Sequence, residues 1–222
     1  MANKILILGG TSEAAALAAE LVAQGHDVTT SLAGRTSDPA PVAGKLRVGG
    51  FGGAKAMAQY LATGGFELLI DATHPFARQI SRNAEIAAQL SNVPMRLLER
   101  PTWQIQAGDN WSEVESLAAA CRAIPAGARV FLALGSQHVA AFAERDDVHF
   151  VVRMVDRPAK DLPLTSHELV IGKPPQTMLE EAELLRAHAI THLVCRNSGG
   201  SRSYAKIEAA RAIALPVIML TR

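Results

Sequence analysis

A glycine turn ends the first apolar run of the chain and leads into a helix-like stretch. Gly9 and Gly10 form this turn in the sequence ILILGGTSEA, and the hydroxyls of Thr11 and Ser12 follow it. Glycines let the backbone approach a phosphate closely, and the first N–H groups of a helix point toward negative charge. Against the dinucleotide-binding pattern G-x-G-x-x-G/A, Thr11 replaces the second glycine and Ala14 takes the third place. Taken alone, the turn is as consistent with a purely structural connection as with a nucleotide site.

The end of the second apolar run distinguishes between nucleotides. NAD sites place an acid about 20 residues after the glycine turn, whereas NADP sites replace the acid and add a cation. The sequence VTTSLAGRT has Ser31 near the place of the acid, and Arg35 and Thr36 follow. These donors would bind a 2′-phosphate and favour NADP. The alternative is a polar loop with a solvated arginine.

Two further segments lie at predicted strand ends. The sequence VGGFGG, with Gly50 and Phe51, allows close backbone approach to a cofactor, although a flexible loop explains it equally well. The sequence DATHPFA contains Thr73 and His74 at the end of the fourth apolar run, where ligands collect in open α/β sheets. His74 titrates near neutrality, so it is a candidate proton donor or ligand for a substrate carboxylate. The alternative is that His74 organises the turn before Pro75.

Short apolar runs alternate with alanine-rich stretches of helical period along the chain. This alternation predicts an α/β fold with parallel sheets. Strands are expected near 4–8, 27–32, 46–49, 67–71, 94–98, 129–134, 149–154, 168–171, 192–195 and 216–220. Helices are expected near 12–24, 53–63, 76–91, 112–122, 176–187 and 204–213. A polar, proline-containing linker near residue 100 separates two predicted domains, 1–99 and 100–222.

Three of these segments together make the chain resemble a known family. With LILGGTSEA, DATHPFA and NSGGSRSYAKIEAARAIALPVIML in this order, the chain resembles the precorrin-6A reductase family of corrin (vitamin B12) biosynthesis over nearly its whole length. The resemblance implies two Rossmann-like domains with the active site in the cleft between them. It also implies NADPH-dependent reduction of one macrocycle double bond, from precorrin-6A to precorrin-6B, or of the cobalt-containing counterpart in the anaerobic route.

The candidate site residues divide between the two domains. Those expected to bind NADPH are Gly9, Gly10, Thr11, Ser12, Ser31, Arg35, Thr36, Gly50, Phe51 and Thr73. A tetrapyrrole with several carboxylates needs hydrogen-bond donors spread over a broad surface, and polar groups recur at later strand ends. Those expected to bind the substrate are His74, Arg78, Ser136, Lys173, Arg196, Asn197, Ser198, Gly199, Gly200, Tyr204 and Lys206. The loop after residue 195 is the strongest candidate for substrate binding among these segments. The alternative is that it is a solvated loop.

Composition excludes some other classes of function. A net charge of +1 and 5% aromatic residues argue against a nucleic-acid-binding protein. No apolar run approaches the roughly 20 residues of a membrane span, and a cytoplasmic location is expected. Cys121 and Cys195 lack metal-site spacing, so no metal site is expected. Neighbouring corrin-pathway enzymes are candidate partners.

Two other functions compete with the reductase. Tyr204 and Lys206 are two residues apart, whereas the short-chain dehydrogenase pair needs four, which disfavours an epimerase or dehydratase of the extended short-chain type. A non-catalytic NADP-binding protein stays open because no essential catalytic acid can be named. Hydride transfer with a proton from solvent would leave the same pattern.

Overall fold

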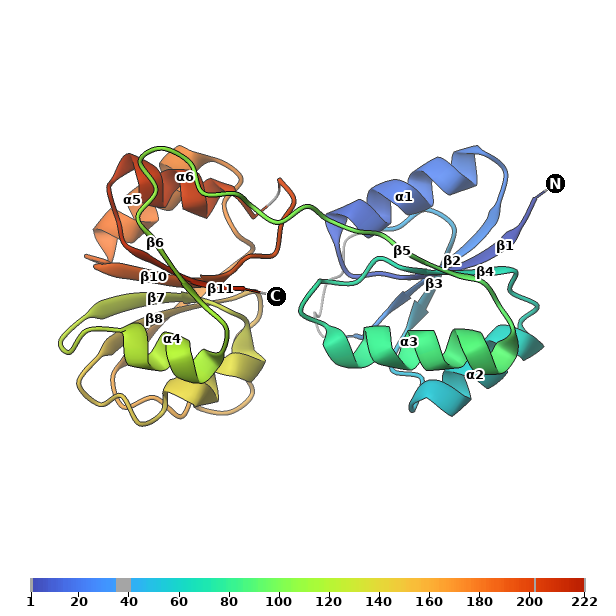
Figure 1. Ribbon diagram of the computed structural model, residues 1–222, viewed down its shortest axis with the longest axis horizontal. Coiled ribbons are helices and arrows are strands. Elements are labelled where there is room, and N and C mark those ends of the chain that lie inside the picture. Colours follow the sequence, from blue (N-terminus) through green and yellow to red (C-terminus); the bar gives the residue numbers. More distant parts are fainter. Residues whose placement is uncertain (1, 35–40, 202, 222) are drawn as a thin grey trace. The chain divides into compact units, whose positions relative to one another are not determined.

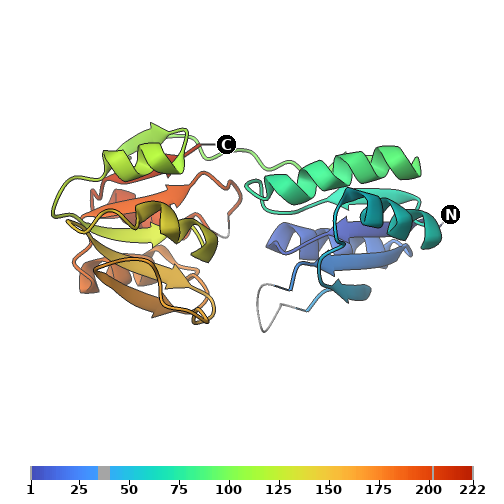
Figure 2. The ribbon, with the colours of Figure 1, turned by 90° about the horizontal axis from the view of Figure 1, so that it is seen from below.

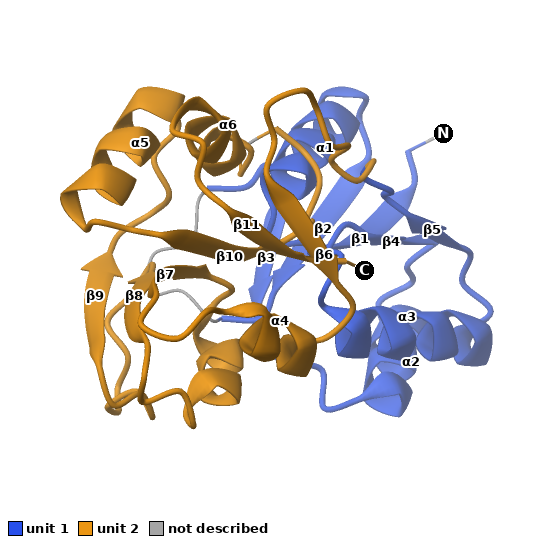
Figure 3. Cartoon of the chain, turned by 60° about the vertical axis from the view of Figure 1, so that its left-hand side comes forward, with its two compact units in different colours: residues 1–100 blue, residues 101–222 orange. Residues whose placement is uncertain are grey.

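The chain divides into two compact units, residues 1–100 and 101–222 (Figure 3). The computed structural model describes residues 2–34, 41–201 and 203–221. Each unit contains one parallel β-sheet with helices on both faces (Figure 1). The predicted α/β class is therefore confirmed. No helix in the described part of the chain is long and apolar enough to cross a membrane.

The first unit is a five-stranded sheet of order β3-β2-β1-β4-β5. Every strand pair in it is parallel. Its strands are β1 (Lys4–Leu8), β2 (Asp27–Leu32), β3 (Lys45–Val48), β4 (Leu68–Asp71) and β5 (Met95–Leu97). Its helices are α1 (Ser12–Ala23), α2 (Ala54–Thr63) and α3 (Arg78–Ser91). Helices α2 and α3 lie beside each other on one face, and α1 covers the other (Figure 1 and Figure 2).

The central strand β1 is buried on both faces. Its alternate side chains divide between two cores, because successive residues of a strand point to opposite faces. Ile5 and Ile7 pack into the core that contains Ala14 and Ala18 of α1. Leu6 and Leu8 pack into the core formed with α2 and α3. This double burial explains why the strand appears in the sequence as an unbroken apolar run.

The second unit is a six-stranded parallel sheet of order β6-β11-β10-β7-β8-β9. Its strands are β6 (Trp111–Val114), β7 (Arg129–Ala133), β8 (His149–Met154), β9 (His167–Ile171), β10 (His192–Arg196) and β11 (Val217–Leu220). Its helices are α4 (Leu117–Ala123), the 3₁₀ helix η1 (Ser136–Phe142), α5 (Met178–Ala187) and α6 (Ala205–Ala212). Without β6, the order β9-β8-β7-β10-β11 repeats that of the first unit.

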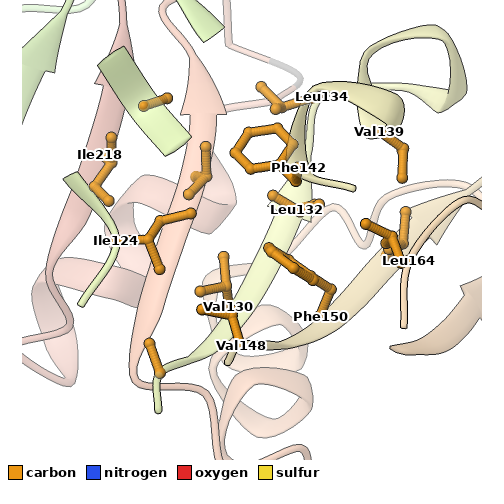
Figure 4. Close-up of a cluster of buried hydrophobic side chains, with 14 of the residues drawn as sticks. Ile124, Val130, Leu132, Leu134, Val139, Phe142, Val148, Phe150, Leu164 and Ile218 are labelled. Atoms are coloured by element: carbon orange, nitrogen blue, oxygen red, sulfur yellow. The ribbon is translucent and has the colours of Figure 1, made fainter. Parts of the chain in front are cut away.

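Strand β7 has the same central role in the second unit as β1 has in the first. Val130 and Leu132 pack with Phe142 and Phe150 in the core on the side of α4 and η1 (Figure 4). Phe131 points into the opposite core, which contains residues of α5 and α6. The two units therefore share one plan, in which an apolar central strand lies between two helical layers.

The segment after the linker differs from the prediction. A helix was expected over 112–122, but residues Trp111–Val114 form the edge strand β6, parallel to β11. Helix α4 begins only after Ser116, whose side chain accepts a hydrogen bond from the Ala119 N–H. The hydroxyl cap fixes the start of the helix. Pairing with β11, which is distant in sequence, makes residues 111–114 a strand. The 3₁₀ helix η1 was not predicted, and the other elements agree within two residues.

Candidate active site

In both sheets the strand order reverses once. The reversal lies between β1 and β4 in the first unit and between β7 and β10 in the second. At such a point the loops after the two neighbouring strands turn to opposite faces and leave a crevice where ligands bind. The loops that begin at Gly9 and Ala72 therefore lie together, as do those that begin at Leu134 and Asn197.

The two glycines after β1 are required for different reasons. A Cβ on Gly9 would stand 2.7 Å from Cγ2 of Thr30 and 3.3 Å from a methyl group of Leu32. Packing against β2 therefore excludes a larger residue at this position. Gly10 has open space around it but a φ of +104°, which L-residues rarely adopt. The turn thus needs both glycines, one for space and one for backbone conformation.

Thr11 connects the turn to the neighbouring strand. It is the N-cap of α1, and its Oγ1 accepts the Ala14 N–H at 3.1 Å. The same hydroxyl donates to the carbonyl oxygen of Ala72, directly after β4, at 2.8 Å. A second glycine could make neither bond. Thr11 therefore fastens the two loops of the crevice together.

Ser12 begins α1 beside an ion pair. Its hydroxyl donates to Oε2 of Glu13 at 2.9 Å, and the guanidinium of Arg100 lies 3.2 Å from the same oxygen. The neighbouring residues therefore fix the orientation of the Ser12 hydroxyl. The main-chain N–H groups at the start of α1 carry the positive end of the helix dipole, which favours an anion there.

The end of β2 is held by an arginine that the sequence reasoning missed. Arg47 of β3 donates to Oγ of Ser31 at 3.2 Å and to the carbonyl oxygens of Gly49 and Gly50 at 2.5 and 3.0 Å. Its guanidinium also lies 3.8 Å from the centre of the Phe51 ring, a cation–π contact. Arg47 thus fixes the loop VGGFGG against β2. An arginine close before a glycine-rich loop with an aromatic residue was the available signal.

Two residues of the predicted phosphate site, Arg35 and Thr36, lie outside the described residues, and Ser31 lies within them. Ser31 is buried at the end of β2, and its carbonyl oxygen accepts the Gly9 N–H at 2.9 Å. The end of β2 therefore adjoins the glycine turn.

The loop after β4 is organised by local hydrogen bonds. The buried Asp71 accepts the N–H and the hydroxyl of Thr73 on one oxygen, at 3.0 and 2.7 Å. The Nδ1 of His74 accepts the Phe76 N–H at 3.2 Å, so in the neutral ring the hydrogen lies on Nε2. Arg78 is exposed at the first position of α3. His74 therefore shapes its turn and also presents a hydrogen-bond donor.

In the second unit, β7 and β10 bring a histidine and an arginine together. Ser136 is exposed at the first position of η1, after Gly135, whose φ is +86°. The Nε2 of His138 lies 3.2 Å from a guanidinium nitrogen of Arg196 at the end of β10. Burial lowers the pKa of the Arg196 guanidinium. This pair places polar and cationic groups at the reversal point of the second sheet.

The first residues of the loop after β10 are buried. Asn197, Ser198 and Gly199 are all buried, and Gly199 and Gly200 adopt φ values of +65° and +72°. The amide of Asn197 is bonded to the backbone of Trp103. The loop is therefore packed against the rest of the unit at its start, and Ser201 further along is exposed.

The two residues predicted after this loop have partners within the unit. The Tyr204 hydroxyl accepts a hydrogen bond from Arg211 at 2.7 Å. Lys206 is 6% exposed, and its Nζ donates to the Ser203 carbonyl oxygen at 2.6 Å. Burial lowers the pKa of Lys206 to about 8, and burial likewise raises the pKa of the neighbouring Cys195 to about 11.

Lys173 lies apart from this group. It follows β9, and β8 and β7 separate that strand from β10. With neighbouring strands about 4.8 Å apart, the ends of β9 and β10 are roughly 14 Å from each other.

Arg153, at the end of β8, forms a buried ion pair with both oxygens of Glu181, at 2.7 and 2.8 Å. No group of three His, Cys, Asp or Glu side chains among the described residues is arranged to hold a metal.

These features define a doubly wound α/β protein made of two Rossmann-like units with polar loops at both reversal points. The profile of the family described as Precorrin-6x reductase CbiJ/CobK matches residues 4–222. The chain therefore belongs to this family of oxidoreductases.

Individual relatives of known name are similar to the chain over nearly its whole length. The chain is 46% identical to a precorrin-6A reductase of Rhodobacter capsulatus, covering 99% of this chain and 88% of the relative. It is 43% identical to one of Rhodococcus erythropolis, with 99% and 89% covered. A solved structure titled CobK precorrin-6A reductase matches with a TM-score of 0.96 and 45% identity, covering 99% of this chain and 88% of the other.

We expect Thr11→Val to weaken both folding and the binding of a nicotinamide cofactor. The change removes the cap of α1 and the bond to Ala72, and losing a cap costs about 1 kcal/mol of unfolding free energy. Thr177→Val is the matched control, because Thr177 caps α5 in the second unit through the Glu180 N–H. Denaturant unfolding should show similar losses for both variants, while titration calorimetry with nicotinamide dinucleotides should show weaker binding only for Thr11→Val. Equal affinities in the two variants would contradict a role of Thr11 in binding at the glycine turn.

Lys206 should make stability depend on pH in the alkaline range. Its pKa falls from 10.5 to about 8 on folding, so between these values the unfolded chain binds more protons than the folded one. The free energy of unfolding contributed by Lys206 should therefore rise with pH from about 8 to 10.5. Subtracting the unfolding free energies of Lys206→Met from those of the wild type isolates this contribution, and Lys45→Met, at an exposed lysine, is the control. A difference that is flat across this range would contradict the lowered pKa of Lys206 in the folded chain.

Proposed function

We propose that the chain reduces one macrocycle double bond of precorrin-6A to give precorrin-6B in cobalamin biosynthesis, with NADPH as the reductant. The observation that carries this proposal is identity of 46% and 43%, over 99% of the chain, to two relatives named precorrin-6A reductase. The glycine turn at the reversal point of the first sheet supports a dinucleotide as the second ligand.

The first unit has the groups that NADPH needs. Gly9 and Gly10 let a pyrophosphate approach the N–H groups at the start of α1. At the end of β2 there is Ser31 in place of an acid, and the guanidinium of Arg47 is bonded to it. A hydroxyl beside a cation suits a 2′-phosphate, which only accepts hydrogen bonds, better than a ribose hydroxyl. In this proposal Gly50, Phe51, Thr73, Arg35 and Thr36 complete the cofactor site.

The reduction adds a hydride and a proton across one carbon–carbon double bond. NADPH supplies the hydride when it is bound. The chain therefore has to orient the two ligands and to hold or admit a proton. His74 is our candidate for that role, as a proton donor or as a hydrogen-bond donor to a substrate carboxylate. Its Nδ1 accepts the Phe76 N–H, so the hydrogen of the neutral ring lies on Nε2. No covalent nucleophile is required.

The second unit supplies the donors for the substrate carboxylates. Arg196 and Ser136 stand at the reversal point of the second sheet, and the backbone of Gly199 and Gly200 follows. A guanidinium can bind a carboxylate through two parallel hydrogen bonds. The remaining proposed substrate residues are Arg78, Lys173, Asn197, Ser198, Tyr204 and Lys206.

The identities favour the metal-free substrate. A relative named cobalt-precorrin-6A reductase, from Priestia megaterium, is 30% identical, well below the relatives named for precorrin-6A. The deciding experiment mixes the purified protein with NADPH and either precorrin-6A or its cobalt complex, and follows the absorbance of the nicotinamide and the macrocycle. Oxidation of NADPH with precorrin-6A supports the proposal. NADPH binding without oxidation, with competent substrate, would favour a non-catalytic NADP-binding protein.

Arg35→Ala should reduce the preference for NADPH over NADH. A hydrogen bond to a charged group is worth about 1.5–3 kcal/mol, so the loss corresponds to roughly 10- to 100-fold in NADPH affinity, with NADH affinity unchanged. Lys45→Ala is a suitable control because Lys45 pairs with Asp27 at 2.8 Å at the opposite end of β3 and β2. If the phosphate preference survives in Arg35→Ala, Arg35 does not contact the 2′-phosphate.

His74→Ala should lower turnover and leave NADPH affinity unchanged. A general acid contributes between about 10² and 10⁴-fold to the rate, and kcat should fall by that factor if His74 donates the proton. His74→Gln separates the two roles, since glutamine keeps a hydrogen-bond donor but cannot supply a proton. Recovery of activity in His74→Gln would assign His74 to substrate binding, and an unchanged rate in His74→Ala would remove it from the reaction.

A further inference from the structure

Trp103 is attached to the loop after β10 through its backbone. Its N–H donates to Oδ1 of Asn197 at 2.8 Å, and its carbonyl oxygen accepts a hydrogen bond from Nδ2 of the same residue at 2.9 Å. The two residues are 94 positions apart, and both are buried. One side chain thus satisfies both backbone groups of Trp103, much as a neighbouring strand would.

The indole of Trp103 holds the other end of the same loop. Its Nε1 donates to the carbonyl oxygen of Gly200 at 2.7 Å. The ring lies 5.6 Å from that of Tyr204, and Nζ of Lys206 lies 5.0 Å from its centre. Trp103 therefore contacts the loop at its first residue, at its second glycine and where α6 begins.

The same segment is attached to α6 a second time. Asp109 accepts hydrogen bonds from Arg211 at 2.8 and 3.2 Å, and Arg211 also donates to the Tyr204 hydroxyl at 2.7 Å. The side chain of Asp109 is only 1% exposed. Residues 103–109, which appear in the sequence as part of a polar linker, are thus fixed at both ends to the second unit.

The loop needs such a partner because its own sequence does not fix its shape. Gly199 and Gly200 both adopt the left-handed conformation, and glycine loses more backbone freedom on ordering than any other residue. A loop ordered before the ligand arrives avoids that loss during binding. The bonds from Trp103 reach both sides of the glycine pair and supply this order.

We propose that Trp103 is a positioning residue for the substrate, which orders residues 197–200 of the loop after β10 so that their backbone and the adjacent Arg196 can bind the carboxylates. The inference rests on the proposed function, since it assumes that this loop contacts the tetrapyrrole. Trp103 itself need not touch the substrate. Its bonds to Asn197 and Gly200 are the means by which it acts.

Trp103→Phe tests the inference, because it keeps an aromatic ring and the backbone bonds to Asn197 but removes the indole N–H that bonds to Gly200. Loss of this hydrogen bond to the half-buried Gly200 carbonyl leads us to expect a rise of about 10-fold in KM for precorrin-6A, with kcat and the Kd for NADPH unchanged. Trp111→Phe is the matched control, since it alters the one other tryptophan, half-buried at the start of β6, and should leave KM unchanged. Asp109→Asn weakens the second attachment and should raise KM to a smaller extent.

Each other outcome contradicts a stated claim. A lower Tm for Trp103→Phe with unchanged KM would make Trp103 a stabilising residue only and overturn the inference. A loss of NADPH affinity in Trp103→Phe as large as its rise in KM for precorrin-6A would overturn the inference as well. Arg196→Gln tests whether the substrate lies at this loop, because a raised KM in this variant keeps the substrate there whatever Trp103 does. An unchanged KM in Arg196→Gln would remove the substrate from this loop and overturn the inference, while the turnover measured leaves the proposed function standing. Only a wild-type protein that fails to oxidise NADPH with competent precorrin-6A would overturn the proposed function.

Discussion

The reversal of strand order in each sheet is the constraint on which the rest of the structure depends. Chain connections leave β1 and β4, and likewise β7 and β10, toward opposite faces, so the loops after each pair of strands begin side by side and then diverge. Backbone groups there lack the partners that they would have inside a sheet or helix, and they must bond to side chains or to a ligand. Thr11 in the first unit and Trp103 in the second provide such partners from the protein. The remaining groups form the surface available for binding.

The fold was predictable wherever local patterns decide it. Strands buried on both faces appear as continuous apolar runs, and Gly9 and Gly10 mark the turn after β1 whatever the turn binds. Residues 111–114 became a strand instead of a helix because pairing with β11 outweighs local preference. The position of Trp103 was not predictable, since bonds across 94 to 97 residues leave no periodic signal.

The candidate site was predictable as a set of loops but not as a set of side-chain roles. A polar residue at a strand end has the same appearance in the sequence whether it bonds to a ligand or to its own unit. Thr11, Asn197, Tyr204 and Lys206 all prove to have partners inside the protein, and their contribution includes holding the loops in place. Arg47 was overlooked because its partners are a hydroxyl and two carbonyl groups, so no acidic residue in the sequence marks it as paired.

The two reversal points differ in a way that matches the two ligands we propose. In the first unit the glycine turn leads into the 12-residue α-helix α1, whose aligned N–H groups concentrate positive potential on one point, as a pyrophosphate requires. In the second unit Gly135 leads into the 3₁₀ helix η1, where hydrogen-bond geometry is poorer, and positive charge comes instead from the side chain of Arg196 beside His138. Side-chain donors can be spread over several strand ends, and a macrocycle with carboxylates around its rim needs such a distribution. One sheet topology can thus serve a compact anion in one unit and an extended polyanion in the other, because the element after the central strand differs.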